Sequence, residues 1–277
     1  MASRLRRLAR SSALVAMIGI PAGIPVGRRI LARELLFHPD RTVASTPSAV
    51  RLDYEDVTFT SADGETLTGF WIPAPERPSL GSVLYCHGNG GNIGHTLRMA
   101  RLLVDRGFDV LTFDYRGFGR STGTPSELGT YRDARAAVAT LLARPGVDAA
   151  RVIYVGESLG GAVALELAVE KPPRALVLQS TFTSIRDEQR LHYPRIPRIL
   201  VPDIYPSVRR IGNLKCPVLI VHGDRDRTVP VTQGRALFEA APGAKRLEIL
   251  PGAHHGLRNE EAERYAALVA GWIRALP

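Results

Sequence analysis

The sequence predicts an α/β fold, in which helices cover both faces of a mostly parallel, doubly wound sheet. Short apolar runs of strand length alternate along the chain with longer segments whose apolar residues recur at helical spacing. This alternation is typical of parallel sheets, because each parallel strand needs a crossover to reach the next. The chain has 277 residues and no internal repeat, so we expect one such domain, preceded by a basic N-terminal tail.

The first predicted elements are the two strands of a hairpin within residues 57–73 (VTFTSADGETLTGFWIP). Both halves alternate apolar and polar residues, and the Asp63-Gly64 pair between them is a strong hairpin turn signal. Because the following strands are expected to be parallel, this antiparallel hairpin belongs at one edge of the sheet.

The remaining elements alternate from residue 82 onwards. The expected strands are the runs SVLYCHG, FDVLTFDYRG, RVIYVGES, RALVLQST, CPVLIVHGD and RLEILPGAHH. A helix is expected after the third of these runs, and further helices are expected at about 94–106, 126–143, 232–241 and 260–276.

One segment, at about 181–213, interrupts this alternation. It contains four prolines too closely spaced for a long helix: Pro194, Pro197, Pro202 and Pro206. It is long enough to be functional, so we expect a small cap over one end of the sheet, with a structural connector as the alternative.

The positive charge of the chain is concentrated at its N-terminus. The formal net charge is +9, and residues 1–43 contribute +6 of it, from eight arginines against Glu34 and Asp40. The rest of the chain is therefore close to neutral, which argues against nucleic acid as a partner.

The tail also holds an uncharged stretch, Ser11 to Gly27, behind its first arginines. Seventeen residues of helix span roughly 25 Å, slightly less than a hydrocarbon core of roughly 30 Å. We therefore take residues 1–43 as a membrane anchor or signal and residues 44–277 as the folded domain. The alternatives are a secreted or periplasmic protein after cleavage and a cytoplasmic one with a soluble tail.

The two cysteines, Cys86 and Cys216, lie at predicted strands and far apart in sequence. They show neither CxxC nor metal-ligand spacing, so we expect buried side chains, with no metal and no cofactor.

A candidate nucleophile lies where the run 152–155 (VIYV) gives way to a helical pattern. Gly156, Ser158 and Gly160 form a G-x-S-x-G motif between a predicted strand and a predicted helix. Glycines on both sides allow a sharp turn that projects the serine at the carboxyl edge of the sheet. A serine hydroxyl becomes a nucleophile when a base takes its proton and an acid orients that base.

Later strand ends supply both missing residue types. Asp224 and Asp226 follow one predicted strand, and His254 and His255 follow the next. Catalytic groups of open α/β sheets gather at the carboxyl ends of the strands, and Ser, Asp, His is the chain order of such sites.

The oxyanion of an acyl-transfer reaction needs two hydrogen-bond donors. We expect the backbone N–H of Leu159, directly after the serine, and that of Asn89 in the glycine-rich loop CHGNGGNIG. His87 in this loop is expected to shape it by hydrogen bonding, and the turn DYRGFGRSTG, with Tyr115 and Arg116, to be structural.

Six stretches resemble the α/β-hydrolase superfamily, and in particular its N-terminally membrane-anchored α/β-hydrolase domain-containing branch. They are, in order, YCHGNGGNIGH, FDYRGFGRSTGTPSE, VGESLGGAVA, STFTSIRD, VHGDRDRTVP and PGAHHGL. The resemblance runs from about Tyr54 to the C-terminus. In the family pattern G-x-x-D-x-x-V-P the acid corresponds to Asp226 rather than Asp224, and an ungapped match of G-A-G-H-G/N selects His255 over His254.

The resemblance implies a serine hydrolase with the triad Ser158, His255 and Asp226. We expect carboxylic esters or thioesters as substrates, of small-molecule or lipid-like acyl type or an acylated protein. Apolar cap residues favour an acyl pocket or packing against the body: Phe182, Ile185, Leu191, Tyr193, Ile196, Ile199, Leu200, Val201, Ile204 and Tyr205. The rival functions are a serine peptidase of the same fold and a non-enzymatic membrane-anchored binding protein.

Overall fold

The computed structural model describes residues 33, 36–192, 194–197 and 201–277. Its main sheet has eight strands in the order β10-β9-β8-β7-β4-β6-β3-β2. The strands are β2 (Glu55–Thr60), β3 (Thr66–Ile72), β4 (Gly81–Cys86), β6 (Phe108–Phe113), β7 (Val152–Glu157), β8 (Ala175–Gln179), β9 (Val218–Gly223) and β10 (Lys245–Leu250). Strand β3 pairs antiparallel with β2 and β6, and the other pairs are parallel. The predicted fold class and the hairpin at the sheet edge are therefore confirmed.

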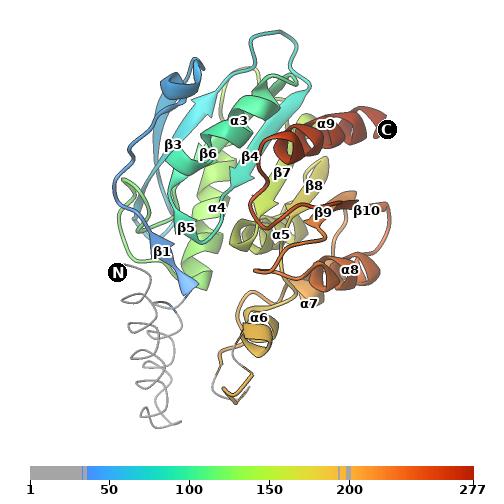
Figure 1. Cartoon of the computed structure of the whole chain (residues 1–277). Helices are drawn as coiled ribbons and strands as arrows, with labels where there is room; N and C mark the ends of the chain where they lie inside the picture. Colours follow the sequence, from blue (N-terminus) through green and yellow to red (C-terminus); the bar gives the residue numbers. More distant parts are fainter. Residues whose placement is uncertain (1–32, 34–35, 193, 198–200) are drawn as a thin grey trace.

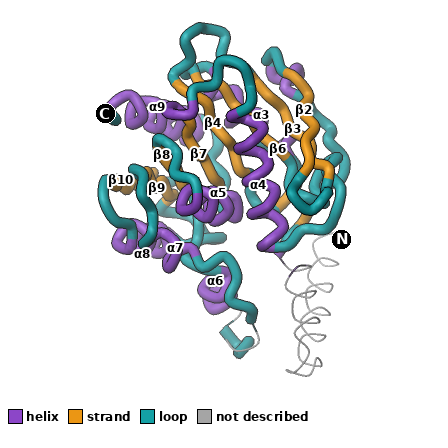
Figure 2. The backbone as a smooth tube through the Cα atoms, turned by 180° about the vertical axis from the view of Figure 1, so that it is seen from behind, coloured by secondary structure: helices purple, strands orange, loops and turns teal. Residues whose placement is uncertain are grey.

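Helices cover both faces of this sheet, as Figures 1 and 2 show from opposite sides. Helices α3 (Leu97–Val104) and α9 (Glu260–Ala275) lie on one face, and α4 (Glu127–Leu142), α5 (Leu159–Glu170) and α8 (Val231–Ala240) lie on the other. The described residues also form short 3₁₀ turns at Pro47–Val50, Ile93–His95 and Ala149–Arg151.

Strand β4 is apolar from Val83 to Cys86, because both of its faces are buried. Val83 and Tyr85 pack into the core under α3 and α9, whereas Leu84 and Cys86 pack into the core under α4 and α5. A strand buried on both faces needs apolar residues at every position, since successive side chains point to opposite faces. Both cysteines are free and buried, and burial raises the pKa of the Cys86 thiol to about 12.

The 181–213 segment follows β8, and its described residues include two short helices, α6 (Ile185–His192) and α7 (Ser207–Ile211). Figure 1 shows α6 projecting away from the sheet. Phe182 and Tyr205 are buried in the main core, and the Tyr205 ring lies 5.6 Å from that of Tyr131. Cap residues such as these pack against the body, whereas Leu191 on α6 is 50% exposed. Tyr193, Ile199 and Leu200 lie outside the described residues.

The chain joins the fold earlier than the boundary at residue 44 that composition predicts. A short strand β1 (His38–Pro39) pairs in parallel with β5 (Gly90–Gly91), and Phe37 is buried. The expected anchor or signal, Ser11 to Gly27, lies outside the described residues. Within the part that the structure describes, no helix is both long and apolar enough to cross a membrane.

Candidate active site

Ser158 occupies a strained turn between β7 and α5. Its φ is 53° and its ψ is −116°, a conformation that residues with a side chain rarely adopt. The flanking glycines make this turn possible: a Cβ on Gly160 would lie 2.0 Å from the Cys86 carbonyl oxygen, and one on Gly156 would lie 2.3 Å from the Gly160 carbonyl oxygen. The sharp turn expected from the G-x-S-x-G spacing is therefore present.

The structure brings Ser158, His255 and Asp226 together in a hydrogen-bonded row. His255 Nε2 lies 3.1 Å from Ser158 Oγ, and His255 Nδ1 lies 2.8 Å from Asp226 Oδ2. Asp226 follows β9 and His255 follows β10, so the three side chains meet at the carboxyl edge of the sheet. In this geometry the imidazole can take the serine proton while the carboxylate holds the opposite ring nitrogen.

The alternative candidates, Asp224 and His254, lie outside this hydrogen-bonded row. Asp224 is exposed, and its Oδ1 accepts a hydrogen bond of 2.7 Å from the backbone N–H of Gly252. His254 is exposed, one residue before the histidine that contacts Ser158.

Hydrogen bonds keep Asp226 ionised. Burial by itself would raise its pKa, but hydrogen bonds from His222, His255 and the Val229 backbone N–H outweigh burial and hold the pKa below the usual range. Asp226 Oδ1 also accepts the Thr228 N–H at 2.9 Å, so the carboxylate is held in one orientation.

Three carboxylates act on His255. Burial lowers the pKa of its imidazole, but the hydrogen bond from His255 to Asp226 and the negative charges of Asp226, Glu157 and Glu188 outweigh burial and raise it. Glu157 accepts a hydrogen bond from Tyr85 Oη at 2.9 Å, and Glu188 accepts one from the Gln233 side chain.

Neither glutamate is among the site residues that the sequence predicts. Glu157 directly precedes Ser158 in the G-x-S-x-G motif, so its position was a usable signal. Glu188 lies on α6, and no local pattern indicates that its charge acts on His255.

Both predicted oxyanion donors border the serine turn. Leu159 is the first residue of α5, so its N–H has no acceptor within the helix. The 87–92 loop lies against the same turn, since a Cβ on Gly88 would be 3.8 Å from Ser158 Cβ. Among the described residues, the backbone N–H of Asn89 has no hydrogen-bond acceptor.

Hydrogen bonds from the turn 114–121 hold the 87–92 loop and the residue that follows it. Tyr115 Oη donates to the His87 carbonyl oxygen at 3.1 Å, and Asp114 Oδ1 accepts the Ile93 N–H at 2.9 Å. His87 Nδ1 donates to the Gly88 carbonyl oxygen at 2.8 Å, so its Nε2 carries no proton in the neutral ring. Burial lowers the pKa of His87 to about 4, which keeps this ring neutral.

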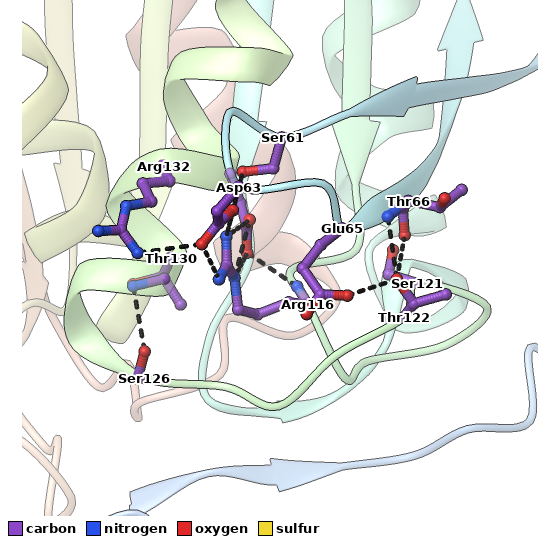
Figure 3. A network of polar contacts seen from close by, with 12 residues as sticks. Ser61, Asp63, Glu65, Thr66, Arg116, Ser121, Thr122, Ser126, Thr130 and Arg132 are labelled. Atoms are coloured by element: carbon purple, nitrogen blue, oxygen red, sulfur yellow. Dashed lines mark hydrogen bonds and ion pairs between the residues drawn. The ribbon is translucent and has the colours of Figure 1, made fainter.

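Arg116 fixes the 114–121 turn to the body, as Figure 3 shows. Its buried guanidinium lies 2.8 Å from a carboxylate oxygen of Asp63, in the hairpin turn, and 2.8 Å from one of Asp133, on α4. Arg132 adds a second cation beside Asp63 at 3.0 Å. Because its guanidinium is paired with Asp63 and with Asp133, Arg116 is a structural group, as the sequence predicts.

Comparison with known proteins gives similarities over most of the chain. Residues 77–210 and 206–262 match the protein family described as "Serine aminopeptidase, S33". An uncharacterized protein of Mycobacterium tuberculosis is 42% identical over 224 residues, which are 80% of this chain and 80% of that protein. The α/β-hydrolase domain-containing protein WAV2 of Arabidopsis thaliana is 32% identical over 230 residues, which are 76% of this chain and 75% of that protein.

The fold also occurs among solved structures. The Pyrococcus furiosus esterase Pf2001 superimposes with a TM-score of 0.70 and 23% sequence identity, over 87% of this chain and 98% of the esterase.

Proposed function

Because this chain belongs to the α/β-hydrolase superfamily, within the family described as "Serine aminopeptidase, S33", it is a hydrolase of the serine type, and we propose that Ser158, His255 and Asp226 form its catalytic triad. The observation that carries the proposal is the row of two hydrogen bonds, 3.1 Å and 2.8 Å long, that links the strained serine to Asp226 through His255.

The proposed reaction is hydrolysis of a carboxylic ester or thioester through an acyl-enzyme. Ser158 Oγ attacks the acyl carbonyl carbon while His255 Nε2 takes the hydroxyl proton. The negative oxygen that forms is bound by the N–H groups of Asn89 and Leu159. His255 then returns the proton to the leaving alkoxide or thiolate. Water, deprotonated by the same imidazole, then attacks the acyl carbon. The bond from this carbon to Ser158 Oγ breaks, His255 returns the proton to Oγ, and the acid is released.

The cap carboxylates favour an ester over a peptide with a free amino terminus. A serine aminopeptidase needs a carboxylate with free oxygen atoms to hold the substrate amine. The cap contains three acidic residues, and each has a partner: Asp187 accepts from Ser184 and Thr183, Glu188 from Gln233, and Asp203 from Arg209. Each of these carboxylates thus already accepts a hydrogen bond within the protein, which makes it a weaker ligand for a substrate amine than an unpaired carboxylate.

Apolar acyl chains are the substrate class that we propose. Helix α6 lies at the margin of the site, since His192 Nε2 is 2.7 Å from the carbonyl oxygen of Thr228, two residues after Asp226. Leu191, the neighbouring residue on α6, leaves half of its surface exposed. Exposed apolar surface at this margin would favour a hydrocarbon chain over a charged acyl group.

The first experiment is labelling of the whole protein with a fluorophosphonate probe. We expect labelling of the wild type and of Ser48→Ala, an exposed serine far from the site in sequence, and none of Ser158→Ala. A folded wild-type protein that takes no label would contradict the triad and favour a binding protein.

The second experiment uses p-nitrophenyl esters from acetate to palmitate, matched thioesters, and aminoacyl p-nitroanilides. We expect turnover of the esters and thioesters to rise with acyl length. Faster cleavage of the anilides would overturn the ester proposal in favour of a peptidase.

A further inference from the structure

The residues that enter the fold from the N-terminal side lie along the 87–92 loop. The backbone N–H of His38 donates to the Asn89 carbonyl oxygen at 2.9 Å, and that of Asp40 donates to the Gly91 carbonyl oxygen at 2.9 Å. The Asn89 side chain donates in return to the Leu36 carbonyl oxygen at 2.7 Å. Asn89 is therefore held to residues 36–42 by both its carbonyl group and its side chain.

The loop needs such external bonds, because its own sequence is permissive. Gly88, Gly90 and Gly91 supply half of the six residues 87–92, and glycine can take up many backbone conformations at little cost. Gly91 has a φ of 80°, in the region that favours glycine. Pairing with residues 36–42 selects one conformation of this loop.

The 36–42 segment is itself anchored on its other side. The Asp40 carbonyl oxygen accepts the Gly119 N–H at 2.9 Å, and Arg41 donates to the Ser121 carbonyl oxygen at 2.6 Å. The Phe37 ring meets that of Phe118 edge-on at 6.3 Å. The segment thus bridges the 87–92 loop and the 114–121 turn, which Arg116 fixes to the body.

We propose that the 36–42 segment is a positioning element of the active site, which holds the backbone N–H of Asn89 in place for the oxyanion. The proposal rests on the function proposed above. It assigns a catalytic consequence to residues that composition places in a tail. Their contribution is made in the transition state, because the negative oxygen that the Asn89 N–H binds develops only there.

A matched pair of variants at His38 tests the positioning role of the 36–42 segment. The His38 side chain is exposed, so His38→Ala keeps the backbone N–H and serves as the control, whereas His38→Pro removes the N–H that Asn89 accepts. We expect His38→Pro to lower kcat/KM for an ester by at least about tenfold. The affinity for a trifluoromethyl ketone, whose adduct with Ser158 carries an oxyanion, should fall in parallel. His38→Ala should match the wild type in both measurements.

Asn89→Ala provides a second test, because it removes the bond to Leu36 without altering the main chain. It decides the proposal if His38→Pro does not fold. We expect lower kcat/KM and weaker ketone binding at temperatures well below its melting point. Wild-type values of both quantities in a folded His38→Pro or in Asn89→Ala would overturn the positioning role.

The two proposals fail differently. If the wild type neither takes the fluorophosphonate label nor turns over esters, the proposed function fails. If the wild type is active and labelled but its kinetics do not respond to these substitutions, only the positioning role fails.

Discussion

His222 and His255 approach the same carboxylate oxygen, Oδ2 of Asp226, at 3.5 Å and 2.8 Å. His222 Nε2 also donates to the Val229 carbonyl oxygen at 2.8 Å, so this nitrogen carries its proton. The His255 N–H donates to this oxygen and the positive end of the His222 N–H group lies close to it, and both stabilise the ionised form of Asp226. An ionised carboxylate at this place holds His255 with its proton on Nδ1 and leaves Nε2 free to receive the proton of Ser158.

A substitution that removes the charge of Asp226 therefore tests its role. Asp226→Asn keeps the shape of the side chain but removes its charge and presents an N–H or a weak acceptor to His255. We expect kcat to fall by about 10⁴-fold, as for the corresponding change in other triads. Asp224→Asn is the control, since Asp224 contacts the Gly252 N–H and not the triad. Equal losses in the two variants, measured with p-nitrophenyl butyrate, would contradict the assignment of the acid.

Glu188 should control the acid limb of the pH profile. The base must be neutral, so activity rises with pH through the pKa of His255, which nearby carboxylates raise. Glu188→Gln keeps the acceptor for Gln233 but removes one of these charges. We expect the acid limb of kcat/KM to move to lower pH by a few tenths of a unit.

Asp203→Asn controls for loss of any cap carboxylate, because Asp203 is paired with Arg209. Its acid limb should coincide with that of the wild type. An unchanged limb in Glu188→Gln would show that this charge does not reach His255.

Asp114 should make the protein less stable as the pH rises. Burial raises the pKa of this carboxyl to about 7, against the opposing effects of the Ile93 N–H and of the Arg120 and Arg41 charges. The folded state thus keeps a proton that the unfolded chain releases near pH 4. Between about pH 4 and pH 7 this group lowers the free energy of unfolding by at most about 1.4 kcal/mol per pH unit.

Asp114→Asn removes that titration. Urea unfolding at pH 5 and pH 8 should show a smaller loss of stability between the two values in Asp114→Asn than in the wild type. Asp105→Asn changes an exposed carboxylate instead and should keep the wild-type difference. The same difference in all three proteins would mean that Asp114 is already ionised at pH 5.

Gly160 is required by the close approach of the serine turn to the end of β4. A Cβ there would collide with the Cys86 and His87 carbonyl oxygens, at 2.0 and 2.5 Å. Gly160→Ala should therefore abolish activity and destabilise the fold by more than about 3 kcal/mol. Gly271→Ala is the matched control, because its Cβ would meet no atom within 4 Å and it lies inside α9. It should stabilise the protein by about 0.5–1 kcal/mol, as judged by thermal melting.

Local pattern was sufficient for the fold class and for the choice of candidate residues. The apolar runs at β4, β7 and β9 are continuous because these strands are buried on both faces, and this signal does not depend on distant residues. The G-x-S-x-G turn is also local, since its two glycines and its serine lie within five residues. The sequence therefore predicted the parallel sheet, the edge hairpin and the sharp turn at Ser158.

Tertiary structure decided which of the two histidines contacts the serine, which of the two aspartates contacts that histidine, and what surrounds the site. His254 and His255 differ by one position, and only the path of the chain after β10 directs the second toward Ser158. No hydrophobic periodicity in the sequence indicates that His38 pairs with Gly90. The effect of Glu188 on His255 likewise depends on where α6 lies in the folded chain. Such contacts join residues far apart in sequence through single hydrogen bonds or charges, so no repeating pattern along the chain records them. The sequence by itself thus determined the sheet and the reactive turn, whereas the environment that tunes His255 and holds Asn89 arises only when distant segments pack together.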